Sequence, residues 1–534
     1  MSRAPSIDIR PDHWEIVSAI LEKHVPQYEV WAFGSRAKWT AKEFSDLDLA
    51  IITDKPLPLE VSAALEEAFS ESNLPFKVDV VDWAATGEGF RNVIEKQSVV
   101  IQNNWKNVLL REVAELFDGP HATPPKAATG TKLFLGISSL SGGRIDISKS
   151  EYISDIDHCK WTKRITPQPG DMVFSYETRL GEAALIPEGL TCCLGRRLGL
   201  LRPHPEKIDN RFLLYYYLGP DFQAFLKSRT VPGSTVDRIS LLEMPNYPLL
   251  LPPLPTQRAI AHILGTLDDK IECNRRMNET LEAMARVIFK DWFVDFSPVC
   301  AKMEGRQPEG MSAKLAALFP DRLDDEGKPE GWRAATLEDL VTLNPKESLR
   351  KGEKSIYVEM ADLPTNLCCI ASSRLREFTS GSKFRQGDTL LARITPCLEN
   401  GKTAFVHFLE DNLLGWGSTE FIVLRAKKDI PQEFCYLLAR EEHFREYAIK
   451  SMTGSSGRQR VQAESLASYS ISDPQPHLWK AFGEIISPWF AAIFFNTAQS
   501  QTLTALRDIL LPKLISGELR IKDAEKFVEE ALDA

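Results

Sequence analysis

The chain has 534 residues, of which 43% are hydrophobic and 26% charged, with a formal net charge of −10. This length exceeds one hydrophobic core, so we expect several globular domains. No apolar run reaches the ~18 residues that span a bilayer, and the start MSRAPSIDIR lacks a secretory pattern, so we expect no membrane partner. The nine cysteines form no C-x-x-C, which argues against zinc or disulfides and favours a cytoplasmic location.

The first predicted strands carry a pattern of glycine, serine and aspartates. The sequence EVWAFGSRAKWTAKEFSDLDLAII predicts one strand that ends at Gly34 and Ser35 and a second that carries Asp46 and Asp48. Side chains two apart on a strand share a face, so both carboxylates can bind one metal ion. A third predicted strand, KVDVV, adds Asp79. Three carboxylates suit Mg²⁺ bound to nucleotide phosphates, which Gly34 and Ser35 can approach.

This pattern, Gly-Ser followed by ten residues and Asp-x-Asp, resembles the minimal nucleotidyltransferases of the DNA polymerase beta superfamily over residues 10–103. The resemblance implies that Gly34 and Ser35 bind the phosphates of a nucleoside triphosphate. It also implies that Asp46, Asp48 and Asp79 bind Mg²⁺ and are catalytic. A degenerate domain that is retained for docking is the alternative.

The remaining chain contains an internal repeat. A helical segment from Arg258 aligns without gaps to one from Lys480, and the shift places Asn274 on Asn496. Both segments have the 3.5-residue apolar period of a coiled coil, which requires a partner helix. We expect the two helices to pair, with the asparagines as a buried polar layer that sets the register. A helix of ~38 residues is roughly 57 Å long.

Two segments of mixed character alternate with these helices. Each shows short β-type runs, such as DMVFSY and EFIVLRA, followed by a helical stretch, which predicts α+β domains. The predicted fold is therefore multidomain α+β: a small α/β nucleotidyltransferase-like domain, then two α+β domains alternating with two long antiparallel coiled-coil helices. The predicted boundaries are 1–104, 105–255, 256–297 (first helix), 298–330 (linker), 331–476, 477–520 (second helix) and 521–534 (tail).

Long strings in this part resemble the specificity subunits of type I restriction-modification systems over residues 106–520. LPPLPTQRAIAHILGTLDDKIECNRRMNETLEAMARVIFKDWF and LRDILLPKLISGEL resemble the family's spacer helices. GDMVFSYETRLGEAALIPEGL and GDTLLARITPCLENGKTAFV resemble its target recognition domains. The resemblance implies a non-catalytic subunit that reads double-stranded DNA at a split target. It also implies two kinds of partner. Two methyltransferase subunits would use S-adenosylmethionine, and restriction subunits would use ATP.

Residues that suit DNA contact occur in both predicted recognition domains. Arginine reads guanine, and hydroxyl and amide groups bind phosphates or adenine. The candidates in the first domain are Tyr176, Arg179, Arg196, Arg197, Ser234, Thr235 and Arg238, and those in the second are Arg393, Thr395, Asn400, Lys402, Ser455, Ser456, Arg458 and Arg460. A solvated surface that binds no DNA is the alternative for any one of these arginines.

Two hypotheses for the whole chain follow. In the first, the chain is a DNA-specificity subunit with an added nucleotidyltransferase-like domain. In the second, it is a metal-dependent nucleotidyltransferase, of the kind found in toxin–antitoxin pairs, that uses the duplicated body to reach a protein or nucleic-acid acceptor. The longer match favours the first hypothesis.

Overall fold

The computed structural model describes residues 6–533 except 121, 232–235, 371–372 and 456. By contacts the chain divides into two units. The first comprises Met1–Asp269 and Thr502–Ala534, and the second Lys270–Gln501. The predicted multidomain α+β architecture is confirmed, with two long helices that each contribute residues to both units.

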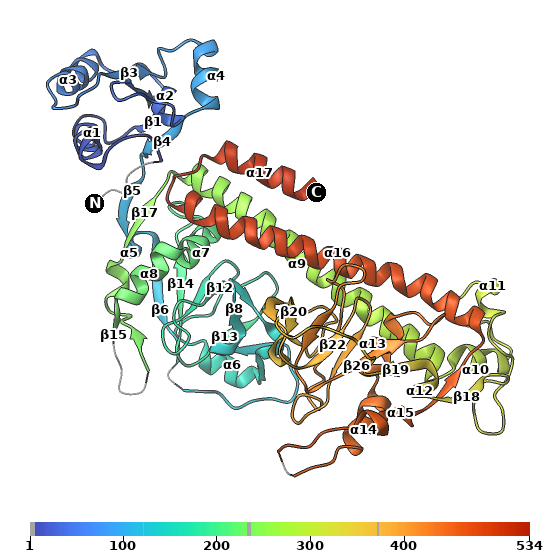
Figure 1. Cartoon of the computed structure of the whole chain (residues 1–534). Helices are drawn as coiled ribbons and strands as arrows, with labels where there is room; N and C mark the ends of the chain where they lie inside the picture. Colours follow the sequence, from blue (N-terminus) through green and yellow to red (C-terminus); the bar gives the residue numbers. More distant parts are fainter. Residues whose placement is uncertain (1–5, 121, 232–235, 371–372, 456, 534) are drawn as a thin grey trace. The chain divides into compact units, whose positions relative to one another are not determined.

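The first unit begins with a small α/β domain around a four-stranded sheet of order β3-β2-β1-β4. β2 pairs antiparallel with β1 and parallel with β3. Figure 1 shows α1 and α3 on one side of this sheet and α4 on the other, and each side has its own apolar cluster. The elements are α1 (Pro11–His24), β1 (Glu29–Phe33), α2 (Gly34–Ala37), β2 (Leu47–Ile52), α3 (Leu59–Ser70), β3 (Val78–Asp82), α4 (Glu88–Lys96) and β4 (Val99–Gln102).

The first α+β half follows in the same unit. Its main sheet has the order β12-β11-β14-β6 and is antiparallel throughout, and a smaller sheet has the order β10-β7-β13 with β13 parallel to β7. The elements are β5 (Lys106–Leu109), α5 (Leu110–Val113), β6 (Ala114–Asp118), β7 (Lys132–Leu135), β8 (Leu140–Ser141), β9 (Arg144–Ile145), β10 (Glu151–Ile153), α6 (Asp155–Trp161), β11 (Met172–Ser175), β12 (Ala183–Leu185), β13 (Cys192–Leu194), β14 (Leu198–Pro203), α7 (Asn210–Leu218), α8 (Pro220–Ser228), β15 (Thr230–Val231), β16 (Arg238–Ile239) and β17 (Pro248–Leu251).

The second α+β half, in the second unit, repeats this topology. Its main sheet reads β24-β23-β26-β19, and its smaller sheet β21-β20-β25-β22 again contains one parallel pair, β20 with β25. The elements are α10 (Ser297–Met303), α11 (Ala313–Ala316), β18 (Arg333–Thr336), α12 (Leu337–Leu340), β19 (Val341–Leu343), β20 (Lys354–Val358), β21 (Arg374–Glu377), β22 (Ser382–Phe384), β23 (Thr389–Ala392), β24 (Thr403–Phe405), β25 (Gly415–Gly417), β26 (Phe421–Ala426), α13 (Glu433–Arg440), α14 (Glu442–Lys450), α15 (Ala463–Ala467) and β27 (Ser470–Asp473).

The repeat places a Gly-Asp pair at the same point of each half, in the sequences PGD at 169–171 and QGD at 386–388. Asp171 and Asp388 are both buried, and each accepts two hydrogen bonds from an arginine of the neighbouring strand, Arg202 and Arg425 respectively. The glycine before each aspartate has a positive φ, +88° at Gly170 and +82° at Gly387, which favours glycine. The motifs are therefore structural in both halves.

The two long helices, α9 (Leu254–Phe293) and α16 (Pro476–Ile515), pair antiparallel within each unit. In the first unit Arg507 forms an ion pair of 2.8 Å with Asp268, and in the second the ring of Phe293 stacks on Trp479 at 4.8 Å between centroids. Because the pairing is antiparallel, residues that are equivalent under the duplication can meet across the seam. Asn274 and Asn496 do so.

Among the described residues, α16 alone is long and apolar enough by composition to cross a membrane. Helices in the core of soluble proteins often have the same length and apolar composition. In α16 the side chains of Phe482, Ile486 and Phe490 are buried in the core of the second unit. The apolar character of this helix is thus used in packing.

Two segments are more ordered than their predicted roles as linker and tail imply. In 298–330, Val299 and Phe319 are buried, and the Phe319 ring meets Trp292 at 5.0 Å between centroids. In the C-terminal segment, α17 (Ile521–Asp533) is a helix. Apolar side chains thus fix residues 298–330 to the core of the second unit.

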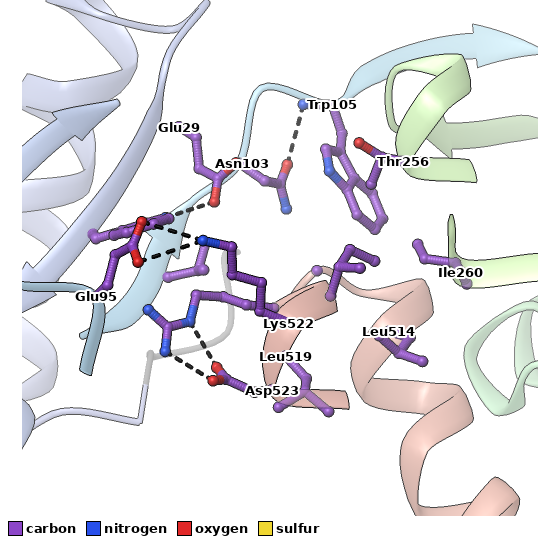
Figure 2. A pocket seen from close by; sticks show the side chains of 15 residues that line it. Glu29, Glu95, Asn103, Trp105, Thr256, Ile260, Leu514, Leu519, Lys522 and Asp523 are labelled. Atoms are coloured by element: carbon purple, nitrogen blue, oxygen red, sulfur yellow. Dashed lines mark hydrogen bonds and ion pairs between the residues drawn. The ribbon is translucent and has the colours of Figure 1, made fainter. Parts of the chain in front are cut away.

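The start of α17 contacts the N-terminal domain in the first unit. The Arg520 side chain donates to Ser98 Oγ at 2.8 Å and lies 5.2 Å from the centre of the Trp31 ring, while Lys522 lies 3.4 Å from the Glu95 carboxylate. Trp31, Glu95, Arg520 and Lys522 line a cavity of about 270 Å³ next to the end of α16, and Figure 2 shows Lys522 pointing toward Glu95. Polar contacts therefore join the two ends of the chain.

Candidate nucleotide site and nucleic-acid interface

The turn at Gly34 lies against Asp48. Gly34 follows β1 directly and has a φ of +75°, and a Cβ there would lie 2.1 Å from Asp48 Oδ2. The antiparallel pairing of Phe33 with Asp48 sets this approach. Both the conformation and the space therefore require glycine at this position. The structure places the Gly34–Ser35 turn beside the carboxylate that the sequence assigns to the same site.

The three predicted carboxylates lie close together. Asp48 and Asp79 are register partners in the parallel pairing of β2 with β3, and Asp46 precedes β2 on an exposed turn. Burial raises the pKa of Asp48, and the negative charges of Asp79 and Asp46 raise it further. Like charges raise a carboxyl pKa in this way only at short range. A cation at this position would relieve the repulsion.

A lysine that the sequence analysis missed already contacts this cluster. The Lys77 ammonium lies 2.5 Å from Asp79 Oδ1, and this contact raises the lysine pKa. With the side chains placed this way, no group of three potential ligands within the described part of the chain is arranged to hold a metal ion. Lys77 stands two residues before Asp79 on the same strand edge, a spacing that could have indicated the ion pair.

Arg36 supports the turn that carries Asp46. Its buried guanidinium donates to the backbone oxygens of Ser45 at 2.7 Å and of Asp8 at 2.8 Å, and lies 3.8 Å from the centre of the Phe76 ring. These contacts fix the segment between α2 and β2. Trp39, in the same segment, has a φ of +57° and is 63% exposed.

In the first α+β half, one prediction needs correction. Tyr176 is 6% exposed, and its hydroxyl donates to Asp118 Oδ1 at 3.1 Å. Burial raises its pKa, and the phenol stays protonated. Tyr176 is a core residue at the end of the main sheet and is not available to DNA. Its aromatic character reflects packing.

The arginines near Tyr176 converge from three segments. The backbone N–H of Tyr176 donates to Arg197 O at 3.2 Å, and a β-bridge joins Glu177 to Arg238. Arg197 forms an ion pair of 2.9 Å with Glu177, and Arg179 one of 2.6 Å with Glu182.

Three of the candidates, Arg179, Arg196 and Arg238, are exposed, although Arg179 is ion-paired. The structure therefore brings the predicted arginines together but neutralises two of them. Ser234 and Thr235 lie outside the described residues.

In the second half too, some of the residues predicted to contact DNA are bonded within the domain and others are exposed. Arg460 forms a two-pronged contact with Glu420, at 2.8 Å and 2.9 Å, and Lys402 donates to Met360 O at 2.7 Å. Arg393 donates to Gln462 and Thr395 to Glu399, so both bond within the domain. The exposed candidates are Asn400, Ser455 and Arg458. Ser456 lies outside the described residues.

The asparagine layer lies in the seam of α9 and α16. Asn274 is 1% and Asn496 7% exposed. Asn274 Nδ2 donates to Gln499 Oε1 at 2.9 Å, and Asn496 Nδ2 to Asn278 Oδ1 at 2.9 Å. Each amide thus has a partner on the opposite helix.

Comparisons with known proteins agree with both parts of the chain. A family model described as type I restriction modification DNA specificity domain matches residues 102–283, and one described as polymerase beta, nucleotidyltransferase matches 15–107. The probable protein adenylyltransferase MntA of Haemophilus influenzae is 52% identical over 108 residues, 20% of this chain and 95% of that protein. The type I restriction enzyme MjaIX specificity subunit of Methanocaldococcus jannaschii is 25% identical over 372 residues, 67% of this chain and 80% of that subunit.

A solved type I S subunit from M. genitalium aligns with a TM-score of 0.48 at 14% identity, over 77% of this chain and 96% of that one. The fold, the duplication and the sequence matches define the class, a duplicated DNA-specificity protein with an added nucleotidyltransferase domain. The chain carries the DNA specificity domain of type I restriction-modification systems over residues 102–283 and is similar to type I specificity subunits, and its N-terminal domain belongs to the polymerase beta type of nucleotidyltransferase.

Proposed function

We propose that the chain selects a two-part DNA target for a type I methyltransferase and restriction complex in the cytoplasm. Each α+β half, which we now call a recognition domain, reads one half-site. The observation that carries this proposal is the repeat of one sheet topology in two domains, joined through paired helices with a shared asparagine layer. Two similar readers on one spacer fit a DNA site with two separated parts.

The surface of α9 in the second unit supports a methyltransferase partner. Met277, Met284 and Val287 are 46%, 44% and 67% exposed, and the last two line a hollow of about 760 Å³. Exposed apolar groups of this kind are typical of protein interfaces. We assign this surface to one of two methyltransferase subunits, which bind S-adenosylmethionine. The restriction subunits, which use ATP, bind through the same complex.

Methylation mapping tests this proposal. The chain and its cognate methyltransferase should modify a split sequence in cells, and replacing residues 105–255 by the corresponding segment of another specificity subunit should change one half-site only. Replacing 331–476 is the matched control and should change the other half-site. Methylation that is unaltered by both exchanges would contradict the proposal.

For the N-terminal domain we propose transfer of a nucleotide from a nucleoside triphosphate to an acceptor hydroxyl. The acceptor oxygen forms a bond to the α-phosphorus, pyrophosphate leaves, and the hydroxyl proton passes to a carboxylate of the cluster. Mg²⁺, held by Asp46, Asp48 and Asp79, supplies charge neutralisation at the phosphates. The proposal is supported by the register pairing of Asp48 with Asp79 and by the pKa of Asp48, which burial raises and the negative charges of Asp79 and Asp46 raise further. Gly34 and Ser35 lie beside this carboxylate to bind phosphate.

Calorimetry of nucleotide binding tests the second proposal. The purified chain should bind a nucleoside triphosphate only with Mg²⁺, and Asp46→Asn with Asp48→Asn should abolish binding because neutral amides attract the cation weakly. Asp54→Asn, on an exposed turn of the same domain, is the control and should bind normally. Because metal needs the ionised carboxylate and the Asp48 pKa is raised, binding should weaken at a higher pH than for an ordinary aspartate. Equal affinity with a chelator would contradict the proposal.

A further inference from the structure

A cavity in the first recognition domain is lined by residues that no motif singled out. It has a volume of about 600 Å³ and lies beside the segment that leads from α6 to β11. Its charged and aromatic walls are Asp118, Lys160, Trp161, Lys163 and Arg164, and Leu194 adds an apolar side.

The positively charged side chains at this cavity have fewer ion-pair partners than the arginines predicted to contact DNA. Lys163 and Arg164 are exposed, and neither forms an ion pair or a side-chain hydrogen bond with another residue in the described part of the chain. Lys160 has a long contact of 3.6 Å with Asp157. By contrast, Arg179 and Arg197 pair with glutamates at 2.6 Å and 2.9 Å. Unpaired cations can bind a polyanion without first losing an intramolecular partner.

The apolar wall of the cavity is held firmly. Trp161, the last residue of α6, packs against the cluster of Phe134, Ile153 and Cys193 in the smaller sheet. The helix is capped by Ser154, whose hydroxyl accepts from the Asp157 N–H at 3.1 Å. Lys163 and Arg164 therefore follow a helix that is capped at its start by Ser154 and packed at its end through Trp161.

The cavity adjoins the arginines predicted to contact DNA. Asp118, in its wall, accepts from the Tyr176 hydroxyl, and the Tyr176 backbone is bonded to Arg197. The exposed Arg196 stands two residues after Leu194, another wall residue. The charges of Lys163, Arg164 and Arg196 thus belong to neighbouring parts of one domain surface.

We infer that this cavity binds the sugar–phosphate backbone of the DNA half-site. Lys163 and Arg164 bind phosphodiester oxygens, and a deoxyribose packs against Trp161. An apolar wall suits a sugar, whereas a base edge needs hydrogen-bond partners. The inference rests on the proposed DNA recognition and adds a sequence-independent contact to it.

The salt dependence of DNA binding tests the inference. The intact chain with its methyltransferase is titrated with target and unrelated duplexes between 50 and 200 mM salt. Each phosphate contact contributes a slope of about 0.9 in log affinity against log salt. The variant Lys163→Gln with Arg164→Gln should therefore lose about 1.8 in slope, and raising the salt fourfold should weaken wild-type binding about twelvefold more than variant binding.

A charge-matched control separates this site from general attraction. Lys126→Gln with Lys149→Gln removes two positive charges from the same domain, but these lysines pair with Glu151 at 2.7 Å and Asp146 at 3.0 Å. The control should keep the wild-type slope. An unchanged slope in the Lys163/Arg164 variant, or a changed target sequence, would overturn the inference. If the wild-type complex itself shows no preference for a split target, the proposed function fails instead.

Discussion

Single buried polar residues connect the long helices to the domains that they carry. Glu282 of α9 is 2% exposed, accepts from the Tyr436 hydroxyl of α13 at 2.5 Å and from the Cys368 N–H at 2.9 Å, and pairs with Arg286. Burial raises the pKa of Tyr436, so its hydroxyl remains a donor. One carboxylate thus joins α9 to two segments of the second recognition domain.

Replacing this carboxylate should destabilise the second unit. Glu282→Leu leaves the Tyr436 hydroxyl and the Cys368 N–H without an acceptor, at about 2–4 kcal/mol in total. Glu282→Gln keeps an acceptor and should lose less. Glu279→Leu, an exposed partner of Arg275 on the same helix, should change stability by about 0.5 kcal/mol or less. Denaturant unfolding of the three variants measures this, and equal midpoints for Glu282→Leu and Glu279→Leu would refute it.

At the scale of elements, the helix seam combines apolar packing with one polar layer. Asn274, Asn278 and Asn496 exchange hydrogen bonds between α9 and α16. A shifted pairing would leave these amides buried without partners, which opposes any other register. In the proposed function this seam sets the spacing of the two half-sites, which gives the register a functional consequence.

Removing the asparagines should increase the stability of the helix pair and weaken the control of its register. Changing Asn274 and Asn496 together to leucine should strengthen the helix pair but allow shifted pairings. Cysteine pairs introduced at matched positions and at positions seven residues out of register would report this by crosslinking. The wild type should crosslink only at matched positions and the variant at both. If the variant also crosslinks only at matched positions, the asparagines do not set the register.

At the scale of the whole molecule, the duplication and the nucleotidyltransferase pattern could be predicted because both depend on long or regularly spaced sequence signals. The pairing of Arg197 with Glu177 and of Arg460 with Glu420 could not, since the partners are 20 and 40 residues apart. The sequence suggests Tyr176 for DNA contact, whereas the sheet buries its side chain. The docking of α17 could not be predicted because its partners lie near the opposite end of the chain.

This docking leads to the last prediction, which concerns the N-terminal domain. Arg520 bonds Ser98, next to β4, and its charge opposes the burial that raises the pKa of Glu29. Arg520→Ala should therefore loosen the domain from α17 and increase hydrogen exchange in residues 98–105. Lys526→Ala, at an exposed lysine further along the same helix, should leave exchange unchanged.

Methylated sequences should be the same in both variants, because each recognition domain has an apolar cluster of its own, separate from that of the N-terminal domain. Increased exchange without a change of target would mean that α17 holds the nucleotidyltransferase domain but takes no part in reading DNA. Unchanged exchange in Arg520→Ala would show that these contacts do not hold the domain, and a changed target would show that the two activities are coupled.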